Sequence, residues 1–75
     1  MSNNVDVSEK LAAAIVALRE RIGKSQAQLA RDSGVTQAEL CRFESGARTP
    51  NVAMLYKLAG GLDTTPSQVL KEAGL

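Results

Sequence analysis

The sequence predicts an all-α fold of five short helices, and three observations lead to this class. Apolar residues recur at helical spacing along most of the chain, and no stretch alternates as strands do. Residues that favour helix starts precede these stretches, and glycine or proline separates them. The 75 residues suffice for one domain, in which we expect residues 1–6 to form a flexible tail and residues 7–75 to fold.

The first helix is expected to follow this tail, with either Asp6 or Ser8 placed to cap it. Gly23 is the expected end, since glycine readily adopts the left-handed conformation that terminates helices. Between these limits the apolar positions lie three or four residues apart and comprise Leu11, Ile15, Leu18 and Ile22.

Two capping boxes mark the next two helix starts. Ser25 begins S-x-x-Q and Thr36 begins T-x-x-E. Each hydroxyl can accept a hydrogen bond from the amide three residues on, while the Gln28 or Glu39 side chain reaches back to the cap. The pattern therefore predicts two short helices in close succession.

Gly34 lies between these helices, which we place at about residues 26–32 and 37–44. A left-handed glycine lets the chain leave one helix and enter the next at a steep angle. Gly46 supplies a second stop of the same kind. Residues 25–45 are thus predicted to form a helix-turn-helix.

A fourth helix should follow Pro50, with one stripe formed by Val52, Leu55, Leu58, Ala59 and Leu62. We expect it to loosen or stop at Gly60 and Gly61, because each glycine costs about 1 kcal/mol relative to alanine inside a helix. Thr65 and Pro66 can start a fifth helix over about residues 66–73.

The third predicted helix carries a candidate reading surface. At about 100° per residue, its inward side holds Leu40 and Phe43, and its outward side holds Gln37, Ala38, Cys41, Arg42 and Ser45. In the DNA major groove glutamine can bridge N6 and N7 of adenine, arginine can bridge O6 and N7 of guanine, and alanine can touch a thymine methyl. We interpret Gln37, Ala38, Cys41 and Arg42 as base-reading residues.

Plainer interpretations exist for these side chains. Many surface helices carry polar residues, and Arg42 could instead pair with Glu39 or Asp32, which would contribute little stability. Cys41 could be a redox switch, although no histidine or second cysteine is present, which favours a small filling side chain. The surrounding helix-turn-helix favours base contact over these interpretations.

Phosphate contacts are expected at the start of the second helix and in the loop after the third. The positive end of a helix dipole and its free amides attract anions. The candidates for phosphate contact or positioning are Ser25, Gln26, Thr36 and Arg48.

Composition argues against several other classes of protein. There is no histidine and only one cysteine, so we expect no metal site, no cofactor and no catalytic triad. No apolar run approaches the length of a membrane span, and the first residues do not look like a signal region, so we expect a cytoplasmic protein. The net charge of +1 is low for a nucleic-acid-binding domain.

These motifs together resemble the Cro and phage-repressor type of helix-turn-helix regulators, the Xre family, over about residues 11–70. The resemblance rests on Leu18-Arg19, Ser25-Gln26-Ala27-Gln28-Leu29-Ala30, Gly34-Val35-Thr36-Gln37, and Phe43-Glu44-Ser45-Gly46 followed by Arg48 and Pro50. It implies a compact five-helix bundle of the phage-repressor type. It also implies that Gln26 touches phosphate and supports Gln37, and that Arg19 pairs with Glu44.

The expected function is that of a bacterial or phage-encoded transcription regulator, such as a repressor, that binds double-stranded DNA as a homodimer on a partly palindromic operator. Exposed apolar residues need cover, so we expect the dimer interface at Val69, Leu70, Ala73 and Leu75, unless these only close the monomer core. The alternative function is a protein-interaction module or antitoxin-like partner that retains the fold. An enzyme is the third and weakest hypothesis, because no activated nucleophile accompanies the carboxylates.

Overall fold

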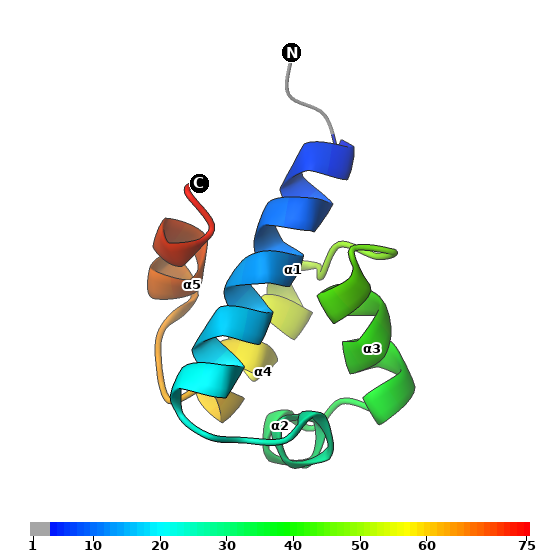
Figure 1. Cartoon of the computed structure of the whole chain (residues 1–75), viewed down its shortest axis with the longest axis vertical. Helices are drawn as coiled ribbons and strands as arrows, with labels where there is room; N and C mark the ends of the chain where they lie inside the picture. Colours follow the sequence, from blue (N-terminus) through cyan, green and yellow to red (C-terminus); the bar gives the residue numbers. More distant parts are fainter. Residues whose placement is uncertain (1–3) are drawn as a thin grey trace.

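The computed structural model describes residues 4–75 of the chain. Within these residues the regular elements are all helices, which confirms the all-α class: α1 (Asn4–Arg21), α2 (Gln26–Ser33), α3 (Gln37–Ser45), α4 (Val52–Gly61) and α5 (Pro66–Glu72). In Figure 1, α1 crosses the centre with α4 behind it, α3 lies on one side, α5 lies on the other, and α2 lies at the bottom. The main packing contacts join α2 to α4 and α1 to α3, and α5 packs against α1.

The helix-turn-helix has both predicted capping boxes. Ser25 accepts a hydrogen bond from the Gln28 amide and Thr36 from the Glu39 amide, and both reciprocal side-chain bonds are present. Gly34 has a φ of 74°, and its amide bonds back to carbonyls of α2. The turn between α2 and α3 therefore forms from local chemistry, as the spacing predicts.

The start of α1 differs from the prediction. The helix begins at Asn4, upstream of both expected caps, because neither glycine nor proline interrupts the residues before Ser8. Ser8 lies inside the helix, is buried, and its hydroxyl bonds to that of Thr49 in the α3–α4 loop. Residues 4–6 of the expected tail are thus helical, and residues 1–3 lie outside the described residues.

The core collects one apolar side of every helix. Its fully enclosed side chains are Ile15, Leu29, Leu40, Phe43, Leu58 and Val69. Two residues predicted to face inward do not: Ile22 is 41% exposed and Val52 is 70% exposed. Ile22 follows the last residue of α1, and Val52 is the first residue of α4. Both therefore lie at helix ends, where the row of apolar side chains extends beyond the core.

The end of α4 involves a close approach to α2. The helix continues through Gly60 and ends at Gly61, so it stops within the predicted glycine pair. A Cβ at Gly61 would lie 2.9 Å from Cδ1 of Leu29 and closer still to Oγ of Ser33. Gly61 is therefore required by packing. The last helix ends at Glu72, one residue short of the prediction, and Ala73 is its C-cap.

Candidate nucleic-acid interface

The outer side of α3 is open to solvent. Leu40 and Phe43 anchor the helix in the core with exposures of 0% and 1%. The structure exposes all five side chains that the sequence places outward, namely Gln37, Ala38, Cys41, Arg42 and Ser45. In Figure 1, α3 lies at the edge of the molecule with its outer side away from α1 and α4.

The acids proposed as protein partners for Arg42 are engaged elsewhere. Asp32 pairs with Nζ of Lys24 at 2.8 Å, and this hydrogen bond lowers the pKa of Asp32. Glu39 accepts hydrogen bonds from the amide and hydroxyl of Thr36, and the backbone hydrogen bond is the main cause of its lowered pKa. Among the described residues no ion pair involves Arg42. Its exposed guanidinium therefore has neither of these acids as a partner in the structure.

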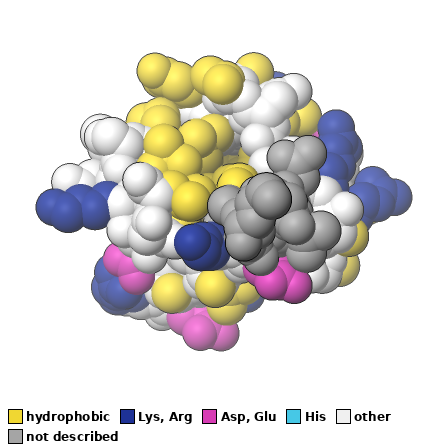
Figure 2. Space-filling model, turned by 90° about the horizontal axis from the view of Figure 1, so that it is seen from above, with side chains coloured by type: hydrophobic (Ala, Val, Ile, Leu, Met, Phe, Trp, Pro, Cys, Tyr) yellow, Lys and Arg dark blue, Asp and Glu magenta, His cyan; other side chains and the backbone are white. Residues whose placement is uncertain are grey.

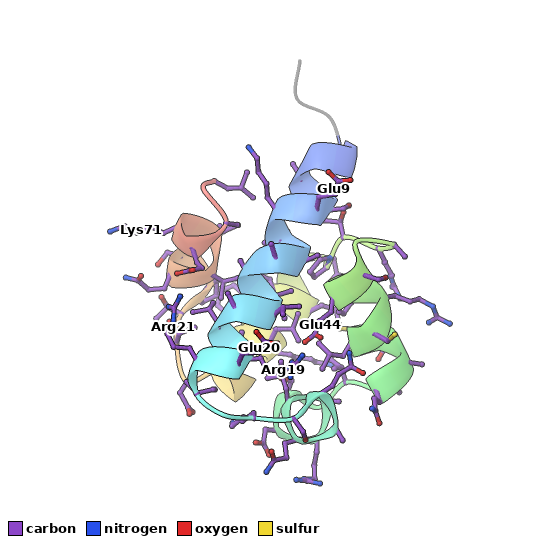
Figure 3. All side chains as sticks on the ribbon, in the orientation of Figure 1. Glu9, Arg19, Glu20, Arg21, Glu44 and Lys71 are labelled. Carbon is purple, nitrogen blue, oxygen red and sulfur yellow. The ribbon has the colours of Figure 1, made fainter. Side chains whose placement is uncertain are left out.

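Arg19 of α1 and Glu44 of α3 form a two-bond ion pair (Figure 3). Nε of Arg19 donates to Oε2 of Glu44 at 2.7 Å, and Nη2 of Arg19 donates to Oε1 of Glu44 at 3.0 Å. The side chains are only 16% and 7% exposed. The hydrogen bond to Glu44 is the largest cause of the raised pKa of Arg19, which keeps this guanidinium charged. The pair joins the C-terminal end of α3 to α1.

Gln26 continues this network toward the reading surface. Its Nε2 donates to Oε1 of Glu44 at 3.1 Å, and its Oε1 accepts from Nε2 of Gln37 at 3.4 Å. The structure therefore links the first residue of α2 to the first residue of α3. The resemblance implies contact between the two glutamines, whereas the bond from Gln26 to Glu44 is an addition from the structure.

The predicted phosphate-contacting residues lie at the start of α2, at the N-cap of α3 and in the loop after α3. Ser25 and Gln26 open α2, and Thr36 caps α3. Arg48 is exposed in the following loop, with its guanidinium carbon 5.6 Å from the centre of the Phe43 ring. A guanidinium stacked on an aromatic face keeps its edge free for an anion.

The predicted dimer residues have unequal exposure. Val69 is fully enclosed by its own chain, so it closes the monomer core and is unavailable to a partner. Leu70 and Ala73 are half-buried against the core, and Leu75 is 51% exposed. More apolar surface lies on α4, where Tyr56 is 64% exposed one turn after Val52. The periodicity of α4 assigns Val52 to the core and thus misses this surface.

Lys24 is a structural residue that the sequence analysis does not identify. Its Nζ donates to the carbonyl of Gly61 at 2.6 Å, in addition to its ion pair with Asp32. It thereby satisfies a carbonyl at the end of α4. No motif signals this contact, because Lys24 and Gly61 are brought together only by the packing of α2 on α4.

Two other features bear on the class of protein. In the described part of the chain, no group of three or more His, Cys, Asp or Glu side chains is placed to hold a metal ion. None of the described helices combines the length and apolar character needed to cross a bilayer.

Comparison with known proteins places this geometry in a family. The family model HTH_3, described as helix-turn-helix, matches residues 15–69. The chain belongs to the HTH_3 family. A search of curated proteins found no match.

Solved structures of several regulators and controller proteins superpose closely on the chain. An HTH_3 family transcriptional regulator from Vibrio cholerae is 30% identical with a TM-score of 0.87, over 92% of this chain and 39% of that protein. The clp gene regulator ClgR from Corynebacterium glutamicum is 28% identical with a TM-score of 0.85, over 91% of this chain and 88% of that one. The restriction-modification controller protein C.AhdI from Aeromonas hydrophila is 31% identical with a TM-score of 0.80, over 83% and 94%.

These matches confirm the five-helix fold and the Xre-type resemblance. The chain spans about two fifths of the Vibrio regulator, whereas it corresponds to most of ClgR and C.AhdI. These three solved proteins are a transcriptional regulator, a gene regulator and a restriction-modification controller protein.

Proposed function

We propose that this HTH_3 protein is a sequence-specific regulator of transcription that binds double-stranded DNA through α3. The observation that carries the proposal is the exposed side of α3, with Gln37 and Arg42 uncovered above a buried Leu40 and Phe43. An α-helix fits the major groove, where each base pair presents its own pattern of donors and acceptors. The match to transcription regulators supports this role over that of an enzyme.

Base selection is assigned to four residues of α3. Gln37 pairs with adenine, Arg42 pairs with guanine, and Ala38 contacts a thymine methyl. Cys41 is exposed between them, and its small side chain lets the helix approach the bases. The absence of an acidic partner for Arg42 among the described residues supports its assignment to a base.

Phosphate binding is assigned to the rim around α3. The capping box uses the amides of Ser25 and Gln28, so the amides of Gln26 and Ala27 remain for a phosphate oxygen. Arg48 contributes a second contact from the loop after α3. Phosphate contacts position the protein without reading sequence, so loss of Arg48 should weaken binding to all duplexes alike.

A second copy of this chain completes the proposed regulator. Two α3 helices about 34 Å apart would enter successive major grooves of a partly palindromic operator. We assign the dimer surface to the apolar side chains that the monomer leaves uncovered, namely Val52, Tyr56 and Leu75, with Leu70 and Ala73 beside them. Viewed from the end of the molecule where both chain ends lie, hydrophobic side chains gather in one area (Figure 2). Such a dimer would act in the cytoplasm by occupying its operator.

Selection of binding sites from random duplex DNA by the purified protein tests this function. We expect the wild type to enrich one sequence. We also expect Gln37→Ala and Arg42→Ala each to lose preference at a different base pair, whereas Lys71→Ala, which removes an exposed charge on α5, changes nothing. Enrichment of no sequence at low ionic strength would contradict the proposal and favour the protein-interaction module.

A further inference from the structure

Gln26 hydrogen bonds in two directions, and the chemistry of its neighbours fixes which way its amide points. It donates through Nε2 to Glu44 and accepts through Oε1 from Gln37. A carboxylate only accepts hydrogen bonds, whereas an amide has one donating and one accepting end. Gln26 must therefore turn its NH₂ group to Glu44, which leaves its carbonyl for Gln37.

Glu44 cannot turn away to release this constraint. Both of its oxygens accept hydrogen bonds from Arg19, at 2.7 and 3.0 Å, and its side chain is 7% exposed. Arg19 is held in turn by a hydrogen bond of 3.1 Å to the carbonyl of Lys24. Glu44 is thus a stationary acceptor at the buried end of the network (Figure 3).

We propose that Glu44 is a positioning residue for base selection, which acts through Gln26 to fix the donor and acceptor ends of the Gln37 amide. This inference rests on the proposed function, because it requires Gln37 to face a base. With one Nε2 hydrogen of Gln37 directed at Gln26, its second Nε2 hydrogen and its Oε1 remain as one donor and one acceptor for DNA.

The fixed amide distinguishes the two purines. Adenine presents a donor at N6 and an acceptor at N7, which match the free acceptor and donor of Gln37. Guanine presents acceptors at both O6 and N7, so the carbonyl of a fixed Gln37 would oppose an acceptor. A Gln37 amide free to turn over could offer its NH₂ group to O6 instead. The network from Glu44 therefore favours adenine over guanine.

The test removes the network without touching Gln37. Gln26→Met takes away the middle link, and the double variant Arg19→Met with Glu44→Met removes the stationary acceptor without leaving a buried charge unpaired. Gln68→Met on α5 is the matched control, because it removes an exposed glutamine remote from α3. Competition binding compares the selected duplex with a copy in which the adenine at the Gln37-dependent position is replaced by guanine.

We expect the wild type and Gln68→Met to prefer adenine by about tenfold, the scale of one bidentate pair. Gln26→Met and the Arg19/Glu44 double variant should lose most of this preference and keep the preference that Arg42→Ala abolishes. A merely structural role for Glu44 would lower affinity at every position alike. Undiminished adenine preference in both network variants would overturn the inference while leaving DNA binding by α3 intact.

A measurement on the protein without DNA distinguishes failure of the Glu44–Gln26–Gln37 hydrogen-bond network from failure of the proposed function. The side-chain NH₂ resonances of Gln37 should shift in both network variants, because a hydrogen bond to Gln26 is lost or weakened, and should stay in place in Gln68→Met. Thermal unfolding checks that each variant is folded. Unchanged Gln37 resonances would overturn the hydrogen-bond network from Glu44 to Gln37 in the free chain. A wild type that selects no duplex would overturn the proposed function.

Discussion

At the scale of single residues, a buried hydrogen-bond network supports Gln37, the exposed residue that we propose reads DNA. Arg19 and Glu44 are nearly enclosed, and their two hydrogen bonds compensate for the loss of water. Buried ion pairs add little stability compared with apolar replacements of both partners, but loss of one partner leaves a charge without compensation. The pair therefore holds α1 and α3 in one relative position.

Replacement of one partner of this pair should be costly, and replacement of both should not. We expect Glu44→Met to lose about 3 kcal/mol of unfolding free energy, because Arg19 stays charged among few other acceptors. The double variant Arg19→Met with Glu44→Met should recover most of this loss. Urea denaturation of the wild type, the two single variants and the double variant measures these losses. Purely additive losses would show that the two residues do not depend on each other.

At the scale of helices, the stability that the capping box contributes at the start of α3 depends on pH. Hydrogen bonds from Thr36 lower the pKa of Glu39, so the folded state favours the carboxylate form. This stabilisation is present above about pH 4.3, the ordinary pKa of glutamate. It is lost as the pH falls through the lowered pKa of the folded state.

Glu39→Gln should therefore flatten the loss of stability in acid. Glutamine can still bond back to Thr36 at the cap, so the helix start is kept. Urea midpoints measured between about pH 3 and pH 6 should fall less steeply for Glu39→Gln than for the wild type. Asp32→Asn is the comparison, since Asp32 also has a lowered pKa but lies outside the capping box. Parallel curves for wild type and Glu39→Gln would contradict this role.

The two adjacent glycines of α4 should respond in opposite ways to alanine. Gly60 has open space where a Cβ would stand, so Gly60→Ala should gain about 1 kcal/mol from higher helix propensity. Gly61 faces Leu29 and Ser33 of α2 at close range, so Gly61→Ala should lose about 1–3 kcal/mol through overpacking. Equal effects of the two substitutions in chemical denaturation would contradict the close contact between α2 and α4.

Elements with local signals could be predicted from the sequence. The starts of α2 and α3 follow from capping boxes that act within four residues. The start of α1, in contrast, has no breaker to locate it. Both expected caps, Asp6 and Ser8, lie within the helix, and the hydroxyl of Ser8 bonds to that of Thr49, far along the chain. The contact of Lys24 with Gly61 likewise depends on packing between distant segments.

The residues of the candidate site likewise fall into those that a local sequence signal predicts and those that depend on contacts between helices. Helical spacing was sufficient to place Gln37 and Arg42 outward, because Leu40 and Phe43 define the opposite side of the same helix. The pairing of Arg19 with Glu44 was implied only by resemblance to a family. The bond from Gln26 to Glu44 required the relative placement of α2 and α3, which no spacing in the sequence encodes.

At the scale of the whole molecule, a net charge of +1 limits non-specific attraction to DNA. In the proposed regulator, specific contacts and a second subunit would then supply more of the affinity. The surface available for a partner lies on α4 and at the C-terminal end, whereas α3 packs against α1 and α2. In the proposed regulator, DNA binding and dimerisation would thus use different parts of the fold.

A charge introduced into the proposed dimer surface should separate the subunits. We expect sedimentation of the wild type to show a dimer that dissociates on dilution, and Tyr56→Asp to remain monomeric over the same range. Ile22→Asp is the matched control, because Ile22 is a partly exposed apolar residue outside the proposed surface. A wild type that stays monomeric at concentrations that saturate its operator would contradict the dimer.

The most direct test of the account is an NMR titration of the labelled protein with its selected duplex. We expect the largest changes in the side-chain resonances of Gln37 and Arg42, and we expect single base-pair substitutions in the duplex to alter them one at a time. Resonances of α5 should change only slightly. Changes that are largest on α4 and α5, with Gln37 and Arg42 unaffected, would contradict the claim that α3 reads DNA.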